Sequence, residues 1–341
     1  MFNLMDRITD PLLPPLIIVE VADAHYGDLN LAKAYISKAS ELNFEVVKFQ
    51  HHIPDEEMLP DIPISKNMKE PLYDFLKKNA LSIDQHKELE DYARKLNINY
   101  LCTPFSLAAA KELNDNLSIW AFKIGSGEFL DHPTIIELMK FNKPLILSTG
   151  MSTESEVDET YEIVKSHKPG IVFMNCTSAY PPSFEDIHLK FIQKMNSKYS
   201  EVVVGHSDHM PTKLTSIAAY CLGARVIEKH VTIDPTLIGP DSEVSLDFDA
   251  LFDLKTDLEN LHKSMNSDKV IHDSEFEIRE WAHRSLVYLR NMNAGELITQ
   301  SDIWSKRPGT GIPARYMSQF VGRELKRNVH NNTLVEENDF K

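Results

Sequence analysis

The sequence contains few cysteines. Its 341 residues include only Cys102, Cys176 and Cys221, each within an apolar segment. A cysteine-based metal site needs closely spaced pairs, and a disulfide framework needs a denser, even-numbered set. Neither pattern occurs here, so we predict three reduced, buried and inert thiols, because a free cysteine packs like a small hydrophobic residue.

Basic residues are also fewer than acidic residues. The chain has 36 lysines and arginines against 51 aspartates and glutamates, which gives a net charge of −15. Nucleic-acid binding requires a basic surface, so the composition argues against a nucleic-acid partner. A local basic pocket for a small anion remains compatible with this acidic total.

Long apolar runs are missing as well. No window approaches the roughly 20 apolar residues that a membrane-spanning helix requires. The first residues include Asp6 and Asp10 and lack a basic region followed by an apolar run, so no signal peptide is expected. These features predict a cytoplasmic protein that has no membrane partner.

What the sequence does contain is a regular alternation of short apolar runs and amphipathic segments. Eight such strand–helix units predict a (β/α)₈ TIM barrel. The alternative is a doubly wound open sheet, but the Gly-x-Gly-x-x-Gly turn typical of that fold is absent. The predicted strands cover residues 16–19, 46–49, 100–103, 119–124, 144–148, 171–174, 202–204 and 226–227.

The amphipathic segments between these strands predict the helices of the barrel. We expect residues 1–15 to form an irregular lead-in and residues 53–80 to form an insert with one helix over 72–78. Asp28 is a candidate N-cap for the first barrel helix. The predicted barrel helices cover residues 29–42, 84–96, 107–113, 132–139, 154–164, 184–195, 213–222 and 248–262.

The pattern changes after the eighth unit. Residues 1–265 are therefore assigned to a barrel domain, and the polar segment 266–283 to a linker. Residues 284–341 contain a strand near 285–289, a turn at 293–295 and a β region over 326–335, which predicts a small β-rich second domain.

Polar side chains follow every predicted strand. The active site of a TIM barrel lies at the carboxyl ends of its strands, so these side chains are expected to meet at one mouth. The side chains at these positions, all polar except Phe105, are Glu20 and His25; Lys48 and Gln50; Thr103 and Phe105; Lys123, Ser126 and Glu128; Ser148 and Thr149; Asn175, Ser178 and Tyr180; Ser207, Asp208 and His209; and Glu228, Lys229 and His230.

Two lysines, Lys48 and Lys123, lie inside apolar strands, where an unpaired ammonium group is costly. One interpretation pairs them with carboxylates such as Glu20, Glu128 or Glu228. The other has them hold an anion, for which phosphate is the natural candidate beside several hydroxyl donors. The sequence leaves both interpretations open.

Two histidines, His209 and His230, end successive strands. Each could simply end its strand, but together they could supply two nitrogen ligands to a divalent metal. Glu20, Asp208 or Asp241 would then provide oxygen ligands or orienting groups, and the metal could polarise a carbonyl. The adjacent pair His51-His52 is instead interpreted as a solvated loop.

Several motifs along the chain resemble the sialic acid synthase family. The C-terminal segments Arg284-Ser285 and Lys306-Arg-Pro-Gly-Thr-Gly311 resemble that family's antifreeze-like SAF domain, a β-clip fold. The barrel motifs are Glu20…His25-Tyr-Gly-Asp28, Val47-Lys-Phe-Gln50, Thr103-Pro-Phe105, Lys123-Ile-Gly-Ser-Gly-Glu128, Ser148-Thr-Gly-Met151, Cys176-Thr-Ser-Ala-Tyr-Pro181, Gly205-His-Ser-Asp-His209, Val226-Ile-Glu-Lys-His230 and Gly239-Pro-Asp241.

This resemblance implies a transferase that condenses phosphoenolpyruvate with an N-acylated mannose-type amino sugar. The products would be phosphate and a nine-carbon 2-keto acid of the sialic, legionaminic or pseudaminic type. His209 and His230 would bind Mn²⁺, with Mg²⁺ or Co²⁺ as alternatives, and Glu20 would transfer protons. Arg307 would reach the N-acyl group of the sugar from the partner subunit of a domain-swapped homodimer.

The resemblance also implies the substrate contacts. Phosphoenolpyruvate would be bound by Lys48, Thr103, Lys123, Ser126, Ser148, Ser178 and Ser207. The sugar would face Glu20, Gln50, Tyr180 and Asp241, and Phe105 and Glu128 complete the predicted substrate-binding set.

The sequence departs from the family pattern at a few positions. The family usually has Val-Asn-His-Asn-Gly where this chain has Asp23-Ala24-His25-Tyr26-Gly27, and it often has asparagine at Ser178 and histidine at Ser242. These changes leave the acceptor sugar open. The alternative functions are a metal-dependent hydrolase or lyase that acts on a sugar phosphate, and a non-catalytic sugar-binding homologue.

Overall fold

The computed structural model describes residues 2–61, 64, 70–236, 239, 241–265 and 268–341. The chain divides into two compact units, Met1–Met265 and Asn266–Lys341. Within the described part of the chain, no helix combines the length and the apolar character needed to cross a membrane.

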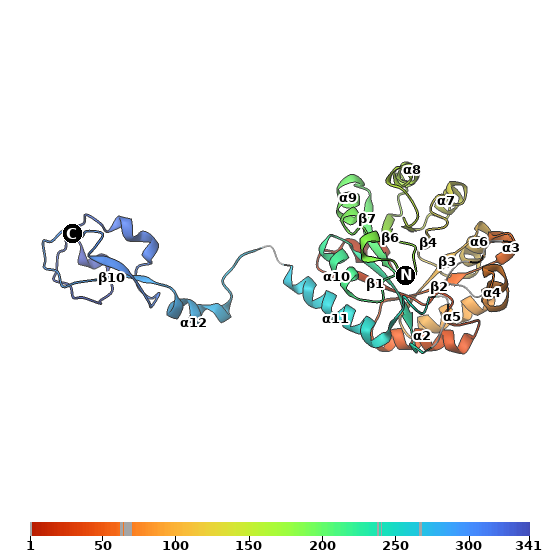
Figure 1. Cartoon of the computed structure of the whole chain (residues 1–341), viewed down its shortest axis with the longest axis horizontal. Helices are drawn as coiled ribbons and strands as arrows, with labels where there is room; N and C mark the ends of the chain where they lie inside the picture. Colours follow the sequence, from red (N-terminus) through yellow and green to blue (C-terminus); the bar gives the residue numbers. More distant parts are fainter. Residues whose placement is uncertain (1, 62–63, 65–69, 237–238, 240, 266–267) are drawn as a thin grey trace. The chain divides into compact units, whose positions relative to one another are not determined.

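The first unit is the predicted parallel barrel, with its helices arranged around the strands (Figure 1). The strands follow the order β3-β2-β1-β8-β7-β6-β5-β4 in the sheet. The parallel ladder between β1 and β8 pairs the first barrel strand of the chain with the last. A short strand, β9 (Leu246–Asp247), adds to β8. The barrel strands are β1 (Leu16–Glu20), β2 (Val46–His51), β3 (Asn99–Pro104), β4 (Phe122–Ile124), β5 (Leu145–Ser148), β6 (Ile171–Cys176), β7 (Val202–Asp208) and β8 (Val226–Thr232).

One seam of the barrel has no ladder. Strands β3 and β4 lie beside each other, but they are not hydrogen-bonded neighbours in the sheet. Trp120, just before β4, crosses this seam by donating from Nε1 to the carbonyl of Tyr100 (2.9 Å). The predicted strand at 119–124 is correspondingly shorter and begins only at Phe122.

Most barrel helices begin at a side chain that accepts from their first free amide groups, whereas those that begin at Lys190 and Leu214 have no such cap. Asp28 caps the first barrel helix, as predicted, by accepting from the amides of Asn30 and Leu31. Ser82 and Thr153 form capping boxes at the helices that begin at Ile83 and Glu154. The barrel helices are α2 (Leu29–Glu41), α5 (Ile83–Lys95), α6 (Leu107–Asn116), α7 (His132–Met139), α8 (Glu154–Val164), α9 (Lys190–Lys198), α10 (Leu214–Cys221) and α11 (Phe248–Ser264).

The predicted helix over 184–195 is wrong in its first half. Residues Phe184–Asp186 form only a short 3₁₀ turn, η1, and α9 begins at Lys190. His188 lies between them with a φ of 49°, a left-handed conformation that an α-helix cannot contain. Further elements follow β2, namely α3 (Pro54–Glu57) and α4 (Leu72–Asn79).

Alternation along each strand separates two apolar cores. In β1, Leu16 and Ile18 point into the barrel, whereas Ile17 and Val19 pack against the surrounding helices. The predicted irregular lead-in is wrong, because α1 (Leu4–Thr9) places Leu4 and Ile8 in the inner core.

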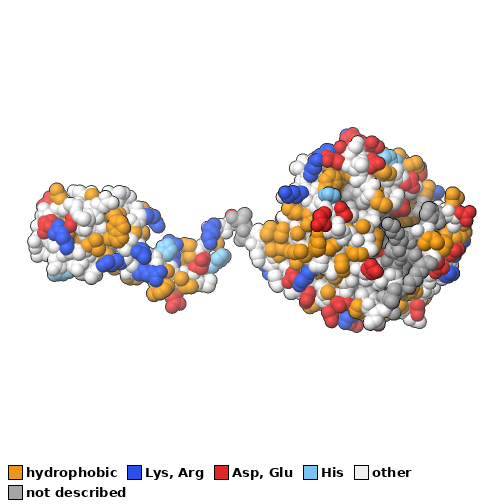
Figure 2. All heavy atoms as spheres, viewed as in Figure 1, with side chains coloured by type: hydrophobic (Ala, Val, Ile, Leu, Met, Phe, Trp, Pro, Cys, Tyr) orange, Lys and Arg blue, Asp and Glu red, His pale blue; other side chains and the backbone are white. Residues whose placement is uncertain are grey.

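The second unit is small, has its own apolar core and combines short β-strands with α and 3₁₀ helices. Strands β10 (Ser285–Tyr288) and β11 (Ile303–Lys306) pair antiparallel, and two 3₁₀ turns follow at η2 (Ala314–Gln319) and η3 (Glu337–Asp339). The segment expected to be a linker contains a helix, α12 (Asp273–Ala282), none of whose residues is buried. Figure 2 shows hydrophobic side chains on the surface of this unit.

Candidate active site

Side chains of β1, β2, β4 and β8 form a cluster of four buried charges. Lys48 Nζ is 2.9 Å from Glu20 Oε2 and 3.6 Å from Glu228 Oε2. Lys123 Nζ is 3.3 Å from Glu228 Oε1. We call Glu20, Lys48, Lys123 and Glu228 the charge tetrad. None of its side chains is more than 5 % exposed, so its four charges compensate one another in a site that excludes most water.

The tetrad shifts the pKa values of its members. Burial opposes the ionisation of Glu228, but Lys123 and Lys48 outweigh it and lower its pKa to about 2. Burial raises the pKa of Glu20 to about 7, against the opposing effect of Lys48. Burial also works against the charge of Lys48, yet Glu20 and Glu228 keep its pKa above the ordinary value. One carboxylate is therefore firmly ionised, while the other can exchange a proton near neutrality.

Hydroxyl groups surround the lysines of the tetrad. Lys123 donates to Ser148 Oγ (2.8 Å) and Lys48 to Thr103 Oγ1 (3.1 Å), while Ser207 donates to Glu228 Oε1 (3.1 Å). Ser126 and Ser178 lie against Gly150, where an added Cβ would collide with both hydroxyls. The structure thus brings together, around one small region, the residues that were predicted to bind phosphoenolpyruvate.

The two predicted metal ligands lie side by side. The rings of His209 and His230 are 5.3 Å apart, and Tyr180 stacks on His209 at 4.3 Å. His209 donates from Nδ1 to the carbonyl of Thr177 (2.8 Å), which leaves Nε2 as the unprotonated nitrogen. Burial lowers the pKa of His209 to about 4 and that of His230 well below its ordinary value. Both rings are therefore neutral at pH 7.

These properties fit two nitrogen ligands of a divalent metal ion, because ligating histidines are neutral and are oriented through the other ring nitrogen. Asp241 Oδ2 lies 3.7 Å from His230 Nδ1. Within the described ranges, no group of three or more His, Cys, Asp or Glu side chains is arranged as a metal site. Water and substrate oxygens would supply further ligands to such an ion.

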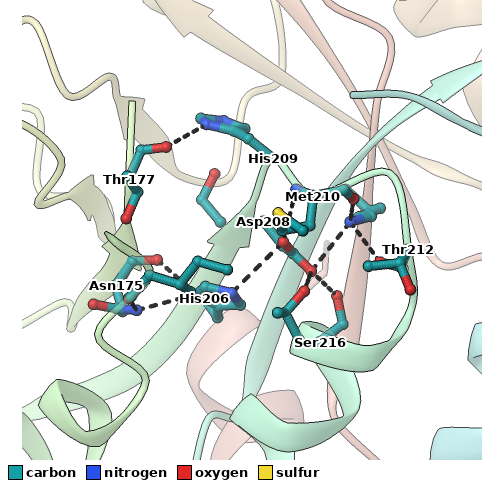
Figure 3. A network of polar contacts seen from close by, with 12 residues as sticks. Asn175, Thr177, His206, Asp208, His209, Met210, Thr212 and Ser216 are labelled. Atoms are coloured by element: carbon teal, nitrogen blue, oxygen red, sulfur yellow. Dashed lines mark hydrogen bonds and ion pairs between the residues drawn. The ribbon is translucent and has the colours of Figure 1, made fainter. Parts of the chain in front are cut away.

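Asp208, which was considered as an oxygen ligand, lies on the other side of β7 (Figure 3). Its Oδ2 accepts from Thr215 (2.8 Å) and Ser216 (2.5 Å), and it pairs with Lys229 Nζ at 3.1 Å. That interpretation is therefore wrong. Lys229, expected with the mouth residues, also points away from the mouth. It is fully buried between β8 and the loop that follows β7, where its Nζ donates to the carbonyl of Thr212 (3.0 Å).

A second polar network extends from the tetrad along β2. Gln50 donates to Glu20 Oε1 (2.7 Å), and His52 donates from Nε2 to Gln50 Oε1 (3.1 Å) and from Nδ1 to Glu57 Oε1 (3.0 Å). Phe105 stacks on His52 at 4.2 Å. Burial works against the charge of His52, but Asp23 and Glu57 raise its pKa.

The prediction of a solvated His51-His52 loop is wrong. His51 is 2 % exposed and His52 is 7 % exposed. Alternation along the end of β2 turns His52 towards the mouth and His51 outwards, where its Nε2 donates to Glu112 Oε2 (2.9 Å). The same alternation along β8 places the side chains of Glu228 and His230, two residues apart, on the same face of the strand.

Two further predicted residues carry raised pKa values. Burial raises the pKa of Glu128 to about 7, and its Oε2 has no hydrogen-bond partner among the described residues. Burial, together with Asp23 and Glu20, raises the pKa of Asp241 to about 7. Asp23 was not among the predicted site residues. Two features of the sequence point to it: it is a charged residue shortly after a buried strand, and it begins the segment Asp23-Ala24-His25-Tyr26-Gly27 that departs from the family pattern.

The remaining predictions concern Arg307 and the cysteines. Arg307 belongs to the second unit, where its guanidinium group stacks over Trp281 at 4.6 Å. Cys102 is buried and Cys176 is partly buried, but Cys221 is exposed at the end of α10, so the prediction of three buried thiols is wrong for Cys221.

Comparison with known families matches residues 35–270 to the NeuB family and residues 283–341 to the SAF domain. The chain belongs to the NeuB family. A Campylobacter jejuni N,N'-diacetyllegionaminic acid synthase is 34 % identical over 94 % of this chain and 99 % of its own length. A Helicobacter pylori pseudaminic acid synthase is 31 % identical over 96 % of this chain and 98 % of its own length.

Comparison with a solved structure supports the assignment of the fold. The N-acetylneuraminic acid (sialic acid) synthetase of Leptospira borgpetersenii serovar Hardjo-bovis, in complex with citrate, superposes with a TM-score of 0.71 and 29 % identity. The match covers 78 % of this chain and 90 % of that chain. This NeuB protein is therefore a synthase on a TIM barrel with a C-terminal SAF domain, and the TIM-barrel and SAF predictions are confirmed.

Proposed function

We propose that this NeuB synthase condenses phosphoenolpyruvate with an N-acylated mannose-type amino sugar. The products would be phosphate and a nine-carbon 2-keto acid. The observation that supports this most directly is the charge tetrad beside two neutral histidines. It combines, in one barrel mouth, groups for a small anion with groups for activating a carbonyl.

The lysines of the tetrad suit the phosphate and carboxylate of phosphoenolpyruvate. In the free protein Lys48 and Lys123 are held by Glu20 and Glu228, so their positions are fixed before a ligand arrives. Fixed charges of this kind stabilise charge that builds up during reaction at little reorganisation cost. The lysines are thus paired with carboxylates in the free site, and they would contact the anion in the occupied site.

His209 and His230 would hold the divalent ion, with Mn²⁺ as the proposed metal and Mg²⁺ or Co²⁺ as alternatives. When bound, the ion would supply Lewis acidity at the aldehyde oxygen of the open-chain sugar. Thr177 fixes the orientation of His209 through the hydrogen bond at Nδ1, and Tyr180 restricts both rings by packing against them.

Carbon 3 of phosphoenolpyruvate would form the new bond to the aldehyde carbon. Water would add at carbon 2, and the tetrahedral intermediate would expel phosphate by cleavage of the C–O bond. Glu20 is the proposed proton-transfer group, because a pKa of about 7 suits both donation and acceptance near neutrality. Lys48, 2.9 Å away, stabilises its ionised form.

The acceptor sugar would occupy the outer part of the mouth. Gln50, Tyr180 and Asp241 offer it polar contacts, and Phe105 offers an apolar face. Glu128 has an unpartnered carboxylate oxygen that can accept a further hydrogen bond. Whether the product is of the sialic, legionaminic or pseudaminic type depends on these contacts.

A second copy of this chain is the proposed macromolecular partner, with Arg307 contributing to the partner's sugar site. Helix α12 supports this, because Trp281 is 64 % exposed and Phe276 is 51 % exposed, and such apolar surface is typical of an interface. Trp281→Ser combined with Phe276→Ser is expected to convert a dimer to monomers in sedimentation velocity. An unchanged sedimentation coefficient would contradict the proposed interface.

The central experiment measures phosphate release from phosphoenolpyruvate by the full chain. Release is expected only with Mn²⁺ and an amino sugar together, using N-acetylmannosamine and a 2,4-diacetamido-trideoxy sugar as test acceptors. Release without any sugar, or full activity after thorough chelation, would contradict the proposal.

A further inference from the structure

The outer part of the barrel mouth contains a carboxylate that makes no hydrogen bond to the described residues. Asp23 follows β1, and its side chain is 13 % exposed. Its buried Oδ1 lies 4.0 Å from His25 Nε2, and its Oδ2 lies 3.7 Å from His52 Nε2. Both distances exceed a hydrogen bond, so the carboxylate is held near two imidazoles but keeps its acceptor capacity.

His25 fixes which oxygen of Asp23 remains available. His25 Nδ1 accepts from the amide of Gly27 (3.0 Å), so the proton of the neutral ring resides on Nε2. That nitrogen is buried and has no hydrogen-bond partner in the described part of the chain. It faces Oδ1, which leaves Oδ2 as the oxygen of Asp23 that a ligand can approach.

The surroundings of Asp23 are acidic. Burial raises the pKa of Asp241, and Asp23 and Glu20 lie close enough to raise it further. Lys48 and His52, the described cations of this cluster, already have carboxylate partners in Glu20 and Glu57. A further negative charge placed here would meet repulsion and no available cation among these residues.

The segment that carries Asp23 is packed against the loop that carries Asp241. Tyr26, with a φ of 49°, places its hydroxyl where a Cβ on residue 239 would lie, so only glycine fits there. Burial raises the pKa of Tyr26, and Asp241 lies near enough to add to this effect. Asp23 and Asp241 therefore stand on two loops that contact each other and bound the same part of the mouth.

We propose that Asp23 determines acceptor specificity, accepting a hydrogen bond from a hydroxyl or N–H of an unphosphorylated sugar and excluding sugars that carry a phosphate. This inference rests on the proposed function. Rejection of a competitor through like charge is a common source of specificity, and it needs no additional contact to the preferred ligand.

The test compares two acceptors that differ by one phosphate, N-acetylmannosamine and its 6-phosphate, with phosphoenolpyruvate and Mn²⁺. The wild-type chain is expected to use the unphosphorylated sugar at least about tenfold better in kcat/KM, the size of one charge–charge contact in a partly buried site. In Asp23→Asn, which keeps the shape and removes the charge, this preference should fall about tenfold, because the phosphate is no longer repelled and the KM for the phosphorylated sugar falls. The KM for phosphoenolpyruvate should stay unchanged.

Glu159→Gln is the matched control, because it removes one negative charge from an exposed position on α8. Equal use of both sugars by the wild-type chain, or an unchanged preference in Asp23→Asn, would overturn the inference while leaving the synthase reaction intact. Absence of phosphate release with every sugar would overturn the proposed function itself. If Asp23→Asn does not turn over, calorimetric binding of the two sugars decides the same question, and equal affinities in the wild-type chain would refute the role of Asp23.

Discussion

Replacing Glu228 by glutamine should destabilise the fold through Lys123. The variant leaves Lys48 its contact with Glu20 at 2.9 Å but removes the carboxylate 3.3 Å from Lys123 Nζ. At an effective dielectric constant of 20, an ion pair at this distance is worth about 5 kcal/mol before the cost of burying Glu228 is subtracted. Breaking a buried pair typically costs 3–5 kcal/mol, so we expect Glu228→Gln to lose about 3 kcal/mol.

The measurement is urea denaturation of wild type, Glu228→Gln and the exposed-charge control Glu159→Gln. The double variant Lys123→Met/Glu228→Gln completes the design, because it removes the orphaned ammonium and keeps Lys48 paired with Glu20. It should recover at least half of the lost stability, since removing both members of a buried pair costs much less than removing one.

The deficit should also depend on pH in a defined direction. Burial lowers the pKa of Lys123 in the folded chain, and Glu228 opposes this effect. Without Glu228 the folded-state pKa falls further below the unfolded value, so the unfolded chain binds more protons between the two and stability rises with pH there. The deficit of Glu228→Gln should therefore shrink as the pH rises above neutral. Wild-type stability in the variant, or a deficit that grows with pH, would refute this reasoning.

Three further predictions concern other parts of the molecule. His209→Ala removes the free Nε2 and should reduce Mn²⁺-dependent turnover at least about 100-fold. It should also weaken Mn²⁺ binding measured by electron paramagnetic resonance, and an unchanged Mn²⁺ affinity would count against the metal site. Lys229→Met leaves the buried Asp208 without its cation and should cost about 3 kcal/mol in urea denaturation, so a loss below about 1 kcal/mol would show that the hydroxyls of Thr215 and Ser216 suffice. Asp302→Asn weakens the hydrogen bonds from Thr299 and Arg290 and should lower the free energy of unfolding of the second unit by about 1.5 kcal/mol at pH 7. Unfolding would be monitored by the fluorescence of Trp281 and Trp304. Burial opposes its charge, but Arg290 and Thr299 hold the pKa of Asp302 below the ordinary value, so this deficit should disappear as the pH falls through that lowered pKa and should not grow in acid.

The barrel was predictable because its strands are short apolar runs separated by capped helices. The end residues of those strands were predictable as a site for the same reason, since parallel strands place their carboxyl ends at one mouth. Ser148, Thr103 and the two lysines therefore meet as expected. Helix α1 escaped detection because it spans only one to two turns, although Asn3 gives it a recognisable N-cap.

The errors at the site come from side-chain direction. His51 and Asp208 were read as mouth or solvent residues, but the period of two along a strand turns both away from the mouth. Glu228 lies two residues before His230 and so shares its face. The sequence offered it as one of several carboxylate partners for the two lysines, but it did not select Glu228 over Glu128 or show that Glu228 contacts both lysines. Pairings of this kind depend on neighbouring strands, and a single sequence does not specify them.

The seam between β3 and β4 gives a bound ligand a means of strengthening the closure of the barrel. Trp120 bridges the seam through one hydrogen bond to Tyr100, whereas the neighbouring strand pairs share continuous ladders. Thr103 ends one side of this seam and Lys123 lies on the other. An anion bound to both residues would act as a cross-link across the gap, so hydrogen exchange at β3 and β4 should slow when phosphoenolpyruvate binds and return to the faster rate when phosphate leaves.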